Sequence, residues 1–435
     1  MPEWPYLLRN GKHLTFPSLF IRPSTHAEAT IAYRAFSETP VETRGIAGYV
    51  CGLKDWREVA PVLSESTPRI DAYPDHTRQK IRLIDPDLHL LFTGPKSEKR
   101  EMMNVRINNE TLGDISVPGV IGPVPLRRAV EAAIGEMESP IPKAQNYANR
   151  FYAHIDRFTY GIEKFQIDND ADIIVGTYVP ITTASIADRQ IDKARKLLRD
   201  SSIMFDKIFT GARKTKDSMA MIAANARIFD TEYSEDILDL AARSDADHVG
   251  IKLLNFNDKD TARAASVLRF VTALRKRLDE IRKPTPIHLF NVMSEFAYAA
   301  FCHGAYSAIV PIATLPDLHF DPNNQASPEI KGRYYHPIDM SYDTYEELCV
   351  KTNAQDFAPP CDCPSCASCQ TIMQALPRWP AFRKEHFLYR KSEEMIEIRN
   401  VPSRNLNVKL RDKFARSQAT SYLPYLDYMY PYVLD

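Results

Sequence analysis

Short apolar runs alternate with longer amphipathic segments through the centre of the chain. Residues 172–179 (DIIVGTYV) form a continuous apolar run, which is typical of a parallel strand covered on both faces. Similar runs predict strands at 219–224, 248–254, 286–292 and 307–312. Between them, apolar residues at helical spacing predict helices at 185–198, 234–242, 260–282 and 294–303. This alternation predicts strand–helix units joined by right-handed crossovers, as in a parallel sheet.

Two earlier strands, predicted at 15–21 and 88–92, extend this pattern towards the N-terminus. An α/β fold of the (β/α)8 TIM-barrel type accounts for all these elements most economically. The segment 95–142 is rich in turn-forming residues, so closure of the barrel through it is an inference. Residues 296–316 carry no Asp, Glu, Lys or Arg over 21 positions, nominally enough to span a bilayer. His303-Gly304 interrupts this run, and we predict a small-residue helix followed by a buried strand.

Composition excludes several classes of protein. The 435 residues include 55 Lys and Arg against 56 Asp and Glu, which excludes a protein whose whole surface is basic and binds nucleic acid through its net charge. Apolar residues make up 44% of the chain, which excludes wholesale disorder. The N-terminal residues lack the pattern of a signal peptide, and a soluble cytoplasmic protein without a membrane segment is expected. The character of the sequence changes after residue 342, which predicts a barrel over 1–345, a metal-binding subdomain over 346–400 and a tail over 401–435.

The motif PPCDCPSCASCQ carries the most specific chemistry in the chain. Cys361, Cys363 and Cys366 form a CxCxxC knuckle, in which three thiolates can surround one ion. Zn²⁺ prefers tetrahedral sulfur and nitrogen ligands, and a structural site needs a fourth protein ligand. His386 follows on a predicted helix at 382–398, where it would lock that helix to the knuckle; Cys369 is the alternative ligand. One structural zinc ion is therefore predicted.

A barrel followed by CxCxxC and a distant His on a helix resembles the tRNA-guanine transglycosylases, especially the archaeosine type. In that type the ligand His opens a His-Asn-Leu-Tyr stretch, and here residues 386–389 read HFLY. Upstream, PIHLFNV (286–292) and HGAYSAIVPI (303–312) resemble the last two barrel strands of the family. ADHVGIKLL (246–254) and DADIIVGTYVP (170–180) resemble two earlier strands, so that the resemblance covers about residues 170–398.

The resemblance implies exchange of a guanine in a polynucleotide, tRNA or DNA, for a 7-deazaguanine-type base. In the family an Asp attacks the ribose C1′ and holds the strand covalently, while a second Asp moves protons. The chain departs from the family where these residues are expected. The last strand reads Tyr306-Ser307-Ala308-Ile309, the strand that normally reads the base has Gly176-Thr177-Tyr178, and the Gly-Gly pair is replaced by Lys252-Leu253. No family residue is therefore carried over as catalytic.

Active sites of such barrels lie at the carboxyl ends of the strands. The polar residues predicted there are Asp230, Glu232, Lys252, Asn255, Asn291, Glu295 and Asp317. Lys252 ends an apolar strand where a cation could hold a phosphate or a base carbonyl, and Asn291 is a second candidate for substrate binding. A serine hydroxyl is protonated at neutral pH, and no neighbouring His or Lys is evident to activate Ser307. If the isolated chain exchanges bases, its nucleophile is expected from another strand end, with Asp230 as the candidate.

The C-terminal part is basic and then aromatic. Residues 383–416 hold ten Lys or Arg against five acids, and such an excess can bind phosphates or remain solvated. Arg404, Lys409, Arg411 and Lys413 are the predicted nucleic-acid contacts. Five Tyr within 421–435 suit docking against the barrel or a partner subunit, with stacking on bases as the alternative.

Two functions remain open from the sequence. The first is a guanine-transglycosylase-like enzyme that acts on polynucleotides, alone or within a homo- or hetero-oligomer. The alternative is a catalytically inactive nucleic-acid-binding or structural partner of an active transglycosylase.

Overall fold

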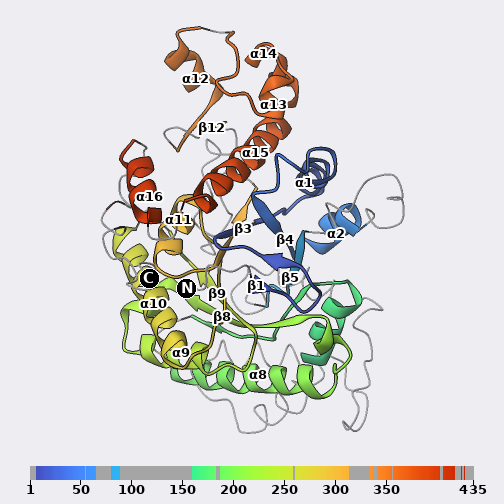
Figure 1. The fold of residues 1–435 in the computed structure, drawn as a ribbon, viewed down its shortest axis with the longest axis vertical. Coiled ribbons are helices and arrows are strands. Elements are labelled where there is room, and N and C mark those ends of the chain that lie inside the picture. Colours follow the sequence, from blue (N-terminus) through green and yellow to red (C-terminus); the bar gives the residue numbers. More distant parts are fainter. Residues whose placement is uncertain are drawn as a thin grey trace.

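The structure of the chain is a computed structural model. It describes residues 6–53, 55–64, 80–88, 159–182, 187–257, 260–312, 334–336, 340–354, 356–401, 405–416, 423 and 426. A barrel of strands lies within a layer of helices, and a smaller C-terminal subdomain projects from it (Figure 1).

Eight parallel strands form a closed barrel. In chain order they are β3 (Ser18–Arg22), β4 (Ile46–Gly52), β5 (Ile81–Asp85), β6 (Ile173–Val175), β8 (Asp217–Asn225), β9 (His248–Leu254), β10 (Ile287–Phe290) and β11 (Ser307–Pro311). The ring closes because β11 pairs with β3 and β6 pairs with both β5 and β8. A two-residue strand, β7 (Pro180–Ile181), adds to β8. The predicted α/β barrel is confirmed.

The predicted strands agree with the structure best in its second half. The bounds of β9 are those predicted, and β8, β10 and β11 differ from the prediction only at their ends. The first half contains three errors. Of the strand predicted at 172–179, only residues 173–175 form a strand (β6), and the separate two-residue strand β7 begins at 180. We did not predict β4, and the strand expected at 88–92 lies instead at β5, while Leu88 is in a turn and residues 89–92 lie outside the described part of the chain. The Asp-Pro-Asp segment at 85–87 explains the error, because proline lacks the N–H that a continuing central strand needs.

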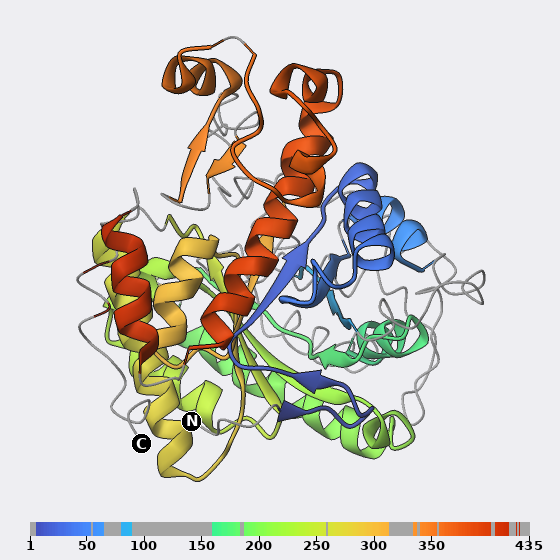
Figure 2. The ribbon, with the colours of Figure 1, turned by 45° about the horizontal axis from the view of Figure 1, so that its top comes forward.

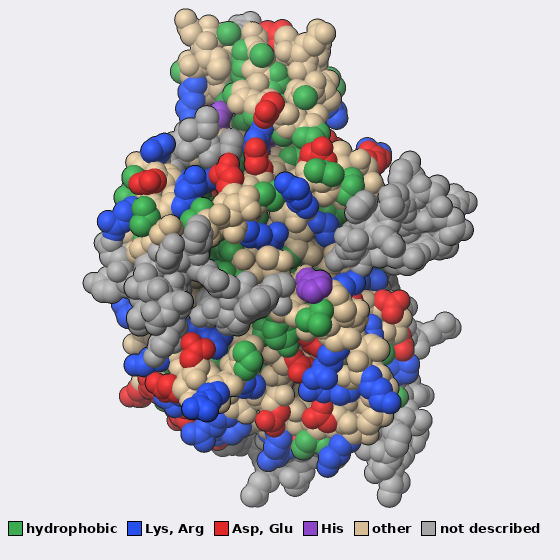
Figure 3. Space-filling view, in the orientation of Figure 1, with side chains coloured by type: hydrophobic (Ala, Val, Ile, Leu, Met, Phe, Trp, Pro, Cys, Tyr) green, Lys and Arg blue, Asp and Glu red, His purple; other side chains and the backbone are tan. Residues whose placement is uncertain are grey.

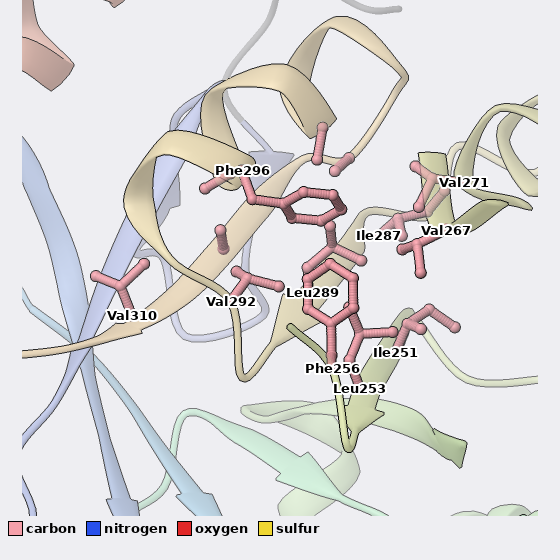
Figure 4. Close-up of a cluster of buried hydrophobic side chains, with 14 of the residues drawn as sticks. Ile251, Leu253, Phe256, Val267, Val271, Ile287, Leu289, Val292, Phe296 and Val310 are labelled. Carbon is pink, nitrogen blue, oxygen red and sulfur yellow. The ribbon is translucent and has the colours of Figure 1, made fainter. Parts of the chain in front are cut away.

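Side chains alternate along the barrel strands between the outer helices and the barrel interior. On β9, Val249, Ile251 and Leu253 belong to the hydrophobic core between strands and helices. Ile251 and Leu253 lie in this outer core (Figure 4). The intervening residues His248 and Lys252 therefore face the barrel interior, although both are polar.

The helices that cover the barrel follow the strands in sequence. They are α1 (His26–Glu38), α2 (Trp56–Ser64), α8 (Ala187–Lys207), α9 (Tyr233–Ala242), α10 (Thr261–Glu280) and α11 (Ser294–Cys302). The four central helices occur close to their predicted positions, and α8 extends nine residues beyond the predicted end at 198. The start of α10 has a local cause: the Asp260 side chain accepts a hydrogen bond from the backbone N–H of Arg263.

A hairpin of β1 (Tyr6–Leu7) and β2 (His13–Leu14) covers the amino end of the barrel. Arg9 Nε lies 3.2 Å from Asp217 Oδ1, and Arg9 Nη2 lies 2.9 Å from Asp247 Oδ1. These acids stand at the starts of β8 and β9, so the hairpin is anchored to the amino ends of the strands. The carboxyl end, where barrels carry their chemistry, is the opposite face.

The C-terminal subdomain is built on a long helix that reaches back to the barrel. Its elements are β12 (Tyr334–His336), β13 (Ser341–Asp343), α12 (Tyr345–Thr352), α13 (Pro364–Ala367), α14 (Ile372–Ala375), α15 (Trp379–Arg399) and α16 (Leu406–Ala415). The helix predicted at 382–398 is α15, which runs from the projecting tip of the subdomain to the barrel and packs beside α1 (Figure 2). Two of these elements, β12 and β13, precede the boundary predicted between residues 345 and 346.

None of the helices in the described ranges is both long and apolar enough to cross a membrane. The uncharged run that begins at residue 296 is divided between α11 and β11.

Candidate metal centre and candidate active site

Three thiols and one imidazole converge where α15 meets the knuckle. The ligand atoms of Cys361, Cys363, Cys366 and His386 all lie within 4.8 Å of one another. His386 Nδ1 is 3.3 Å from the sulfur of Cys361, 3.3 Å from that of Cys363 and 3.4 Å from that of Cys366. In a tetrahedral zinc site these atoms are separated by about 3.5 Å. The cluster could hold one metal ion, and its donor set suits zinc.

Neighbouring groups hold the imidazole in the orientation that a metal needs. His386 Nε2 lies 2.7 Å from the carbonyl oxygen of Tyr335, which leaves Nδ1 to face the thiols. The Tyr334 ring stacks on His386 with a centroid separation of 4.1 Å, and its hydroxyl lies 3.3 Å from Cys366 Sγ. Both tyrosines belong to β12. The local motif does not include them, because Cys361, its first cysteine, lies 27 residues after Tyr334.

The structure brings His386, and not Cys369, to the three thiols. Cys369 is buried, and its sulfur lies 3.6 Å from Arg378 Nη2 and 3.8 Å from the hydroxyl of Ser368. Within the residues that the structure describes, no other group of side chains has the geometry of a metal site.

A buried cluster of charged side chains lies at the carboxyl end of the barrel. Lys252 Nζ, from β9, is 2.5 Å from Asp85 Oδ2 and 3.1 Å from Asp87 Oδ1. Arg22, the last residue of β3, contacts the same two carboxylates at 2.7 Å each. Tyr178 donates a hydrogen bond of 3.2 Å to Asp85 Oδ1. We call Arg22, Asp85, Asp87, Tyr178 and Lys252 the mouth cluster.

The mouth cluster is largely buried, so its charged groups lose the favourable hydration that they would have in water. The side chains of Asp85, Asp87 and Lys252 are 0% exposed, and that of Arg22 is 17% exposed. Burial alone would lower the pKa of Arg22, but the carboxylates of Asp87, Asp85 and Asp55 outweigh it and raise that pKa above its ordinary value. A buried group of charges survives only when each charge is paired with good geometry, and such groups are frequent at functional sites.

Backbone geometry also marks this end of the barrel. Asp87, Asn255 and Asn291 follow β5, β9 and β10, and their φ values are 49°, 50° and 65°. Residues other than glycine seldom adopt this conformation, although Asn and Asp tolerate it best. At Gly52, the end of β4, an added Cβ would lie 2.4 Å from Arg22 Nη2 and 2.7 Å from Asp87 Oδ2. Only glycine leaves room for the mouth cluster at that position.

The predicted site residues fall in different places. Lys252 is in the mouth cluster, and the buried Asn291, which donates a 3.3 Å hydrogen bond to Leu253 O, ends the neighbouring strand. Asp230 ends the 3-10 helix η3 (Ala226–Asp230) and is hydrogen-bonded to Ser266 of α10. Its side chain is 44% exposed, and none of its contacts belongs to the mouth cluster.

Sequence reasoning missed Arg22, Asp85 and Asp87. Displacing the strand to 88–92 put the two carboxylates before the strand instead of at its carboxyl end. The pattern that could have found them is the apolar run at 81–84 that ends in two acids around a proline.

A second polar chain lies at the opposite, amino end of the barrel. Ser307 Oγ is 2.6 Å from His288 Nδ1, His288 Nε2 is 2.9 Å from His248 Nδ1, and His248 Nε2 is 3.0 Å from Asp217 Oδ2. The expectation that Ser307 has no neighbouring His is therefore wrong. Burial, together with His248, holds the pKa of His288 well below its usual range, so this imidazole is neutral. All four side chains are buried near the N-terminal hairpin. Their hydrogen bonds to one another satisfy polar groups that would otherwise lie unpaired inside the barrel.

The basic C-terminal residues are only partly on the surface. Lys409 and Arg411 are exposed on α16, whereas Lys413 turns inward and its Nζ lies 3.2 Å from Glu394 Oε1. Arg404 lies outside the described residues. A groove of about 360 Å³ between α15 and α16 is lined by four cations and four acids, so it has no net charge. Positive and negative side chains are also interspersed over the face of the molecule in Figure 3.

Compared with known proteins, the chain matches no protein-family model and no curated sequence.

Proposed function

We propose that the chain exchanges a guanine base in a polynucleotide for a 7-deazaguanine-type base, with the mouth cluster as its active site. The observation that carries this proposal is the pair of carboxylates, Asp85 and Asp87, held by two cations at the carboxyl end of the barrel. The resemblance to guanine transglycosylases lacked a carboxylate on the last strand. A pair on β5 and in the turn that follows it would supply the missing group from another strand end.

The two carboxylates have different surroundings, which favours Asp87 as the nucleophile. Both oxygens of Asp85 accept hydrogen bonds: Oδ2 from Lys252 and Arg22, and Oδ1 from Tyr178 and the backbone N–H of Asp87. Asp85 is therefore best suited to orient its neighbours. Asp87 lies beyond the strand end, and its Oδ1 is in contact with both Arg22 and Lys252. An oxygen of Asp87 would attack the ribose C1′ and later leave it when the incoming base arrives.

In this proposal the Cys361–Cys363–Cys366–His386 site holds one zinc ion with a structural role. Four protein ligands leave no position for water or substrate on a tetrahedral ion. The ion would tie α15 to the knuckle and so stabilise a subdomain that has only a small core.

The full chain should form a covalent adduct that survives denaturation when it is incubated with tRNA or duplex DNA and a 7-deazaguanine base. Radiolabelled guanine should enter one of these polynucleotides. Asp87→Asn should abolish the adduct and the exchange, whereas Asp230→Asn, outside the mouth cluster, should retain both. Exchange that survives Asp87→Asn and disappears with Asp230→Asn would contradict the proposal.

A second function, that of an inactive binding partner, is favoured by the saturation of Asp85. All four of its hydrogen bonds come from the protein, as in a carboxylate with a purely structural role. Salt-dependent binding of polynucleotide by the wild-type chain without adduct or exchange would support this second function.

A further inference from the structure

We propose that Lys252 is the proton carrier of the exchange reaction, giving a proton to the departing base and recovering it from the incoming one. This inference rests on the proposed function and adds to it a residue that the resemblance to transglycosylases does not supply. The resemblance places the family's Gly-Gly pair at Lys252-Leu253, so the family's own residues do not supply this amine.

The position of Lys252 argues for a charged ammonium. Its side chain is 0% exposed and lies within 3.1 Å of oxygens from both carboxylates. Both contacts are ion pairs between an ammonium and a carboxylate, and an ammonium has no lone pair with which to act as a nucleophile. An ammonium beside the reacting carboxylate is instead a proton donor.

The two cations of the mouth cluster cannot share this task. A guanidinium stays protonated in proteins, so Arg22 can hold the carboxylates but cannot release a proton. An ammonium can do both. Arg22 is therefore a positioning residue, and Lys252 is the group able to move a proton between the mouth cluster and a bound base.

The reaction balances in both directions. In the first step a C1′–O bond forms to Asp87 and the bond from C1′ to the base nitrogen breaks. The electron pair of the broken bond stays on that nitrogen, which takes a proton from Lys252, so the base departs neutral and Lys252 becomes an amine. In the second step the nitrogen of the incoming base bonds to C1′ and gives its proton to Lys252. The C1′–O bond breaks, and its electron pair returns to Asp87.

Charge balance within the mouth cluster supports this pairing of events. At rest Asp85 and Asp87 face Arg22 and Lys252, and the carboxylate of Asp55 lies 3.9 Å from Arg22 Nη2. Ester formation at Asp87 removes one negative charge, and proton loss from Lys252 removes one positive charge. The covalent intermediate therefore keeps the net charge of the resting cluster, so no additional uncompensated charge is buried.

The decisive experiment compares two leaving bases in the full-length variant Lys252→Arg. The arginine keeps the positive charge, so the variant can fold, but it cannot release a proton. Guanine exchange should fall by about 10²–10⁴-fold, the range attributed to general acids. Release of 7-methylguanine, which leaves without needing a proton, should stay within about threefold of wild type. The assay uses tRNA and duplex DNA that carry each base.

Four results separate the possible interpretations. Asp87→Asn should lose both reactions, because it removes the nucleophile. Equal losses with guanine and 7-methylguanine in Lys252→Arg would overturn the inference and leave Lys252 as a positioning residue. A borohydride-trapped adduct on Lys252 would also overturn it, because the amine would then be the nucleophile. If the wild-type chain turns over neither base, the proposed function itself fails, which is a different result.

Discussion

Replacing Lys252 by Met tests the energetics of the mouth cluster without any assumption about the reaction. The substitution leaves two buried carboxylates facing only Arg22. Removing one partner of a buried ion pair costs about 3–5 kcal/mol, because a charge is left uncompensated in the interior. Arg22 still lies 2.7 Å from each carboxylate, so we expect the lower part of this range, about 3 kcal/mol.

The chain offers a matched control with the same ion-pair distance. Lys164 Nζ also lies 2.5 Å from a carboxylate, that of Asp168, but these two side chains are 44% and 52% exposed. Exposed pairs at this spacing contribute about 0.3–0.5 kcal/mol. Lys164→Met should therefore lower the free energy of unfolding by at most about 0.5 kcal/mol.

Urea denaturation followed by circular dichroism measures both variants against wild type. The double variant Lys252→Met with Asp85→Asn should be more stable than the sum of the two single effects by about 1 kcal/mol or more, because it removes a charge of each sign. If Lys252→Met and Lys164→Met were equally destabilised, the electrostatic reasoning for the mouth cluster would be refuted.

Three further outcomes are expected. Elemental analysis should find one zinc ion per chain. The variant Cys363→Ala should lose this ion and destabilise the C-terminal part, whereas Cys369→Ala should keep it. Finding iron, or a folded protein without metal, would contradict the proposed zinc site. Burial raises the pKa of Glu163 to about 8, so the folded chain retains a proton that the unfolded chain releases, and stability should fall as pH rises from about 4.5 to about 8. Glu163→Gln should remove this loss, giving a higher Tm than wild type at pH 8 and an equal one near pH 4. If α16 contacts phosphates, replacing Lys409 and Arg411 by Ala should reduce the slope of log affinity against log salt by up to about two; an unchanged slope would show that both are merely solvated.

Local patterns in the sequence were enough for the three thiol ligands and for most of the barrel, whereas the choice of His386 over Cys369 needed the structure. The three cysteines lie within six residues, so the knuckle brings them together through short-range geometry alone. Buried parallel strands such as β9 read as uninterrupted apolar runs because both of their faces are covered. In the second half of the barrel the predicted bounds were close to those observed, whereas the run at 172–179 forms a strand over residues 173–175 only.

The mouth cluster depended on information that no local pattern contains. Asp85 and Lys252 are separated by 167 residues, and only closure of the barrel brings the third and sixth strands within hydrogen-bonding distance. The strand wrongly predicted at 88–92 placed Asp85 and Asp87 at the amino end of a strand, although they lie at the carboxyl end of β5. A polar residue can belong to a site at the mouth of the barrel only if it lies at the carboxyl end of its strand and its side chain points away from the outer helices.

Lys252 illustrates the division between sequence and structure. The sequence placed Lys252 near the end of an apolar strand, as a cation that could hold a phosphate or a base carbonyl. The sequence could not say whether this ammonium contacts solvent, a phosphate or a carboxylate. The pattern along β9 does not determine whether the side chain points into the barrel or which residues surround it, because both depend on the assembled barrel. The tertiary structure decided this by setting Arg22, Asp85 and Asp87 around it, since an unpaired charge could not be buried at that position.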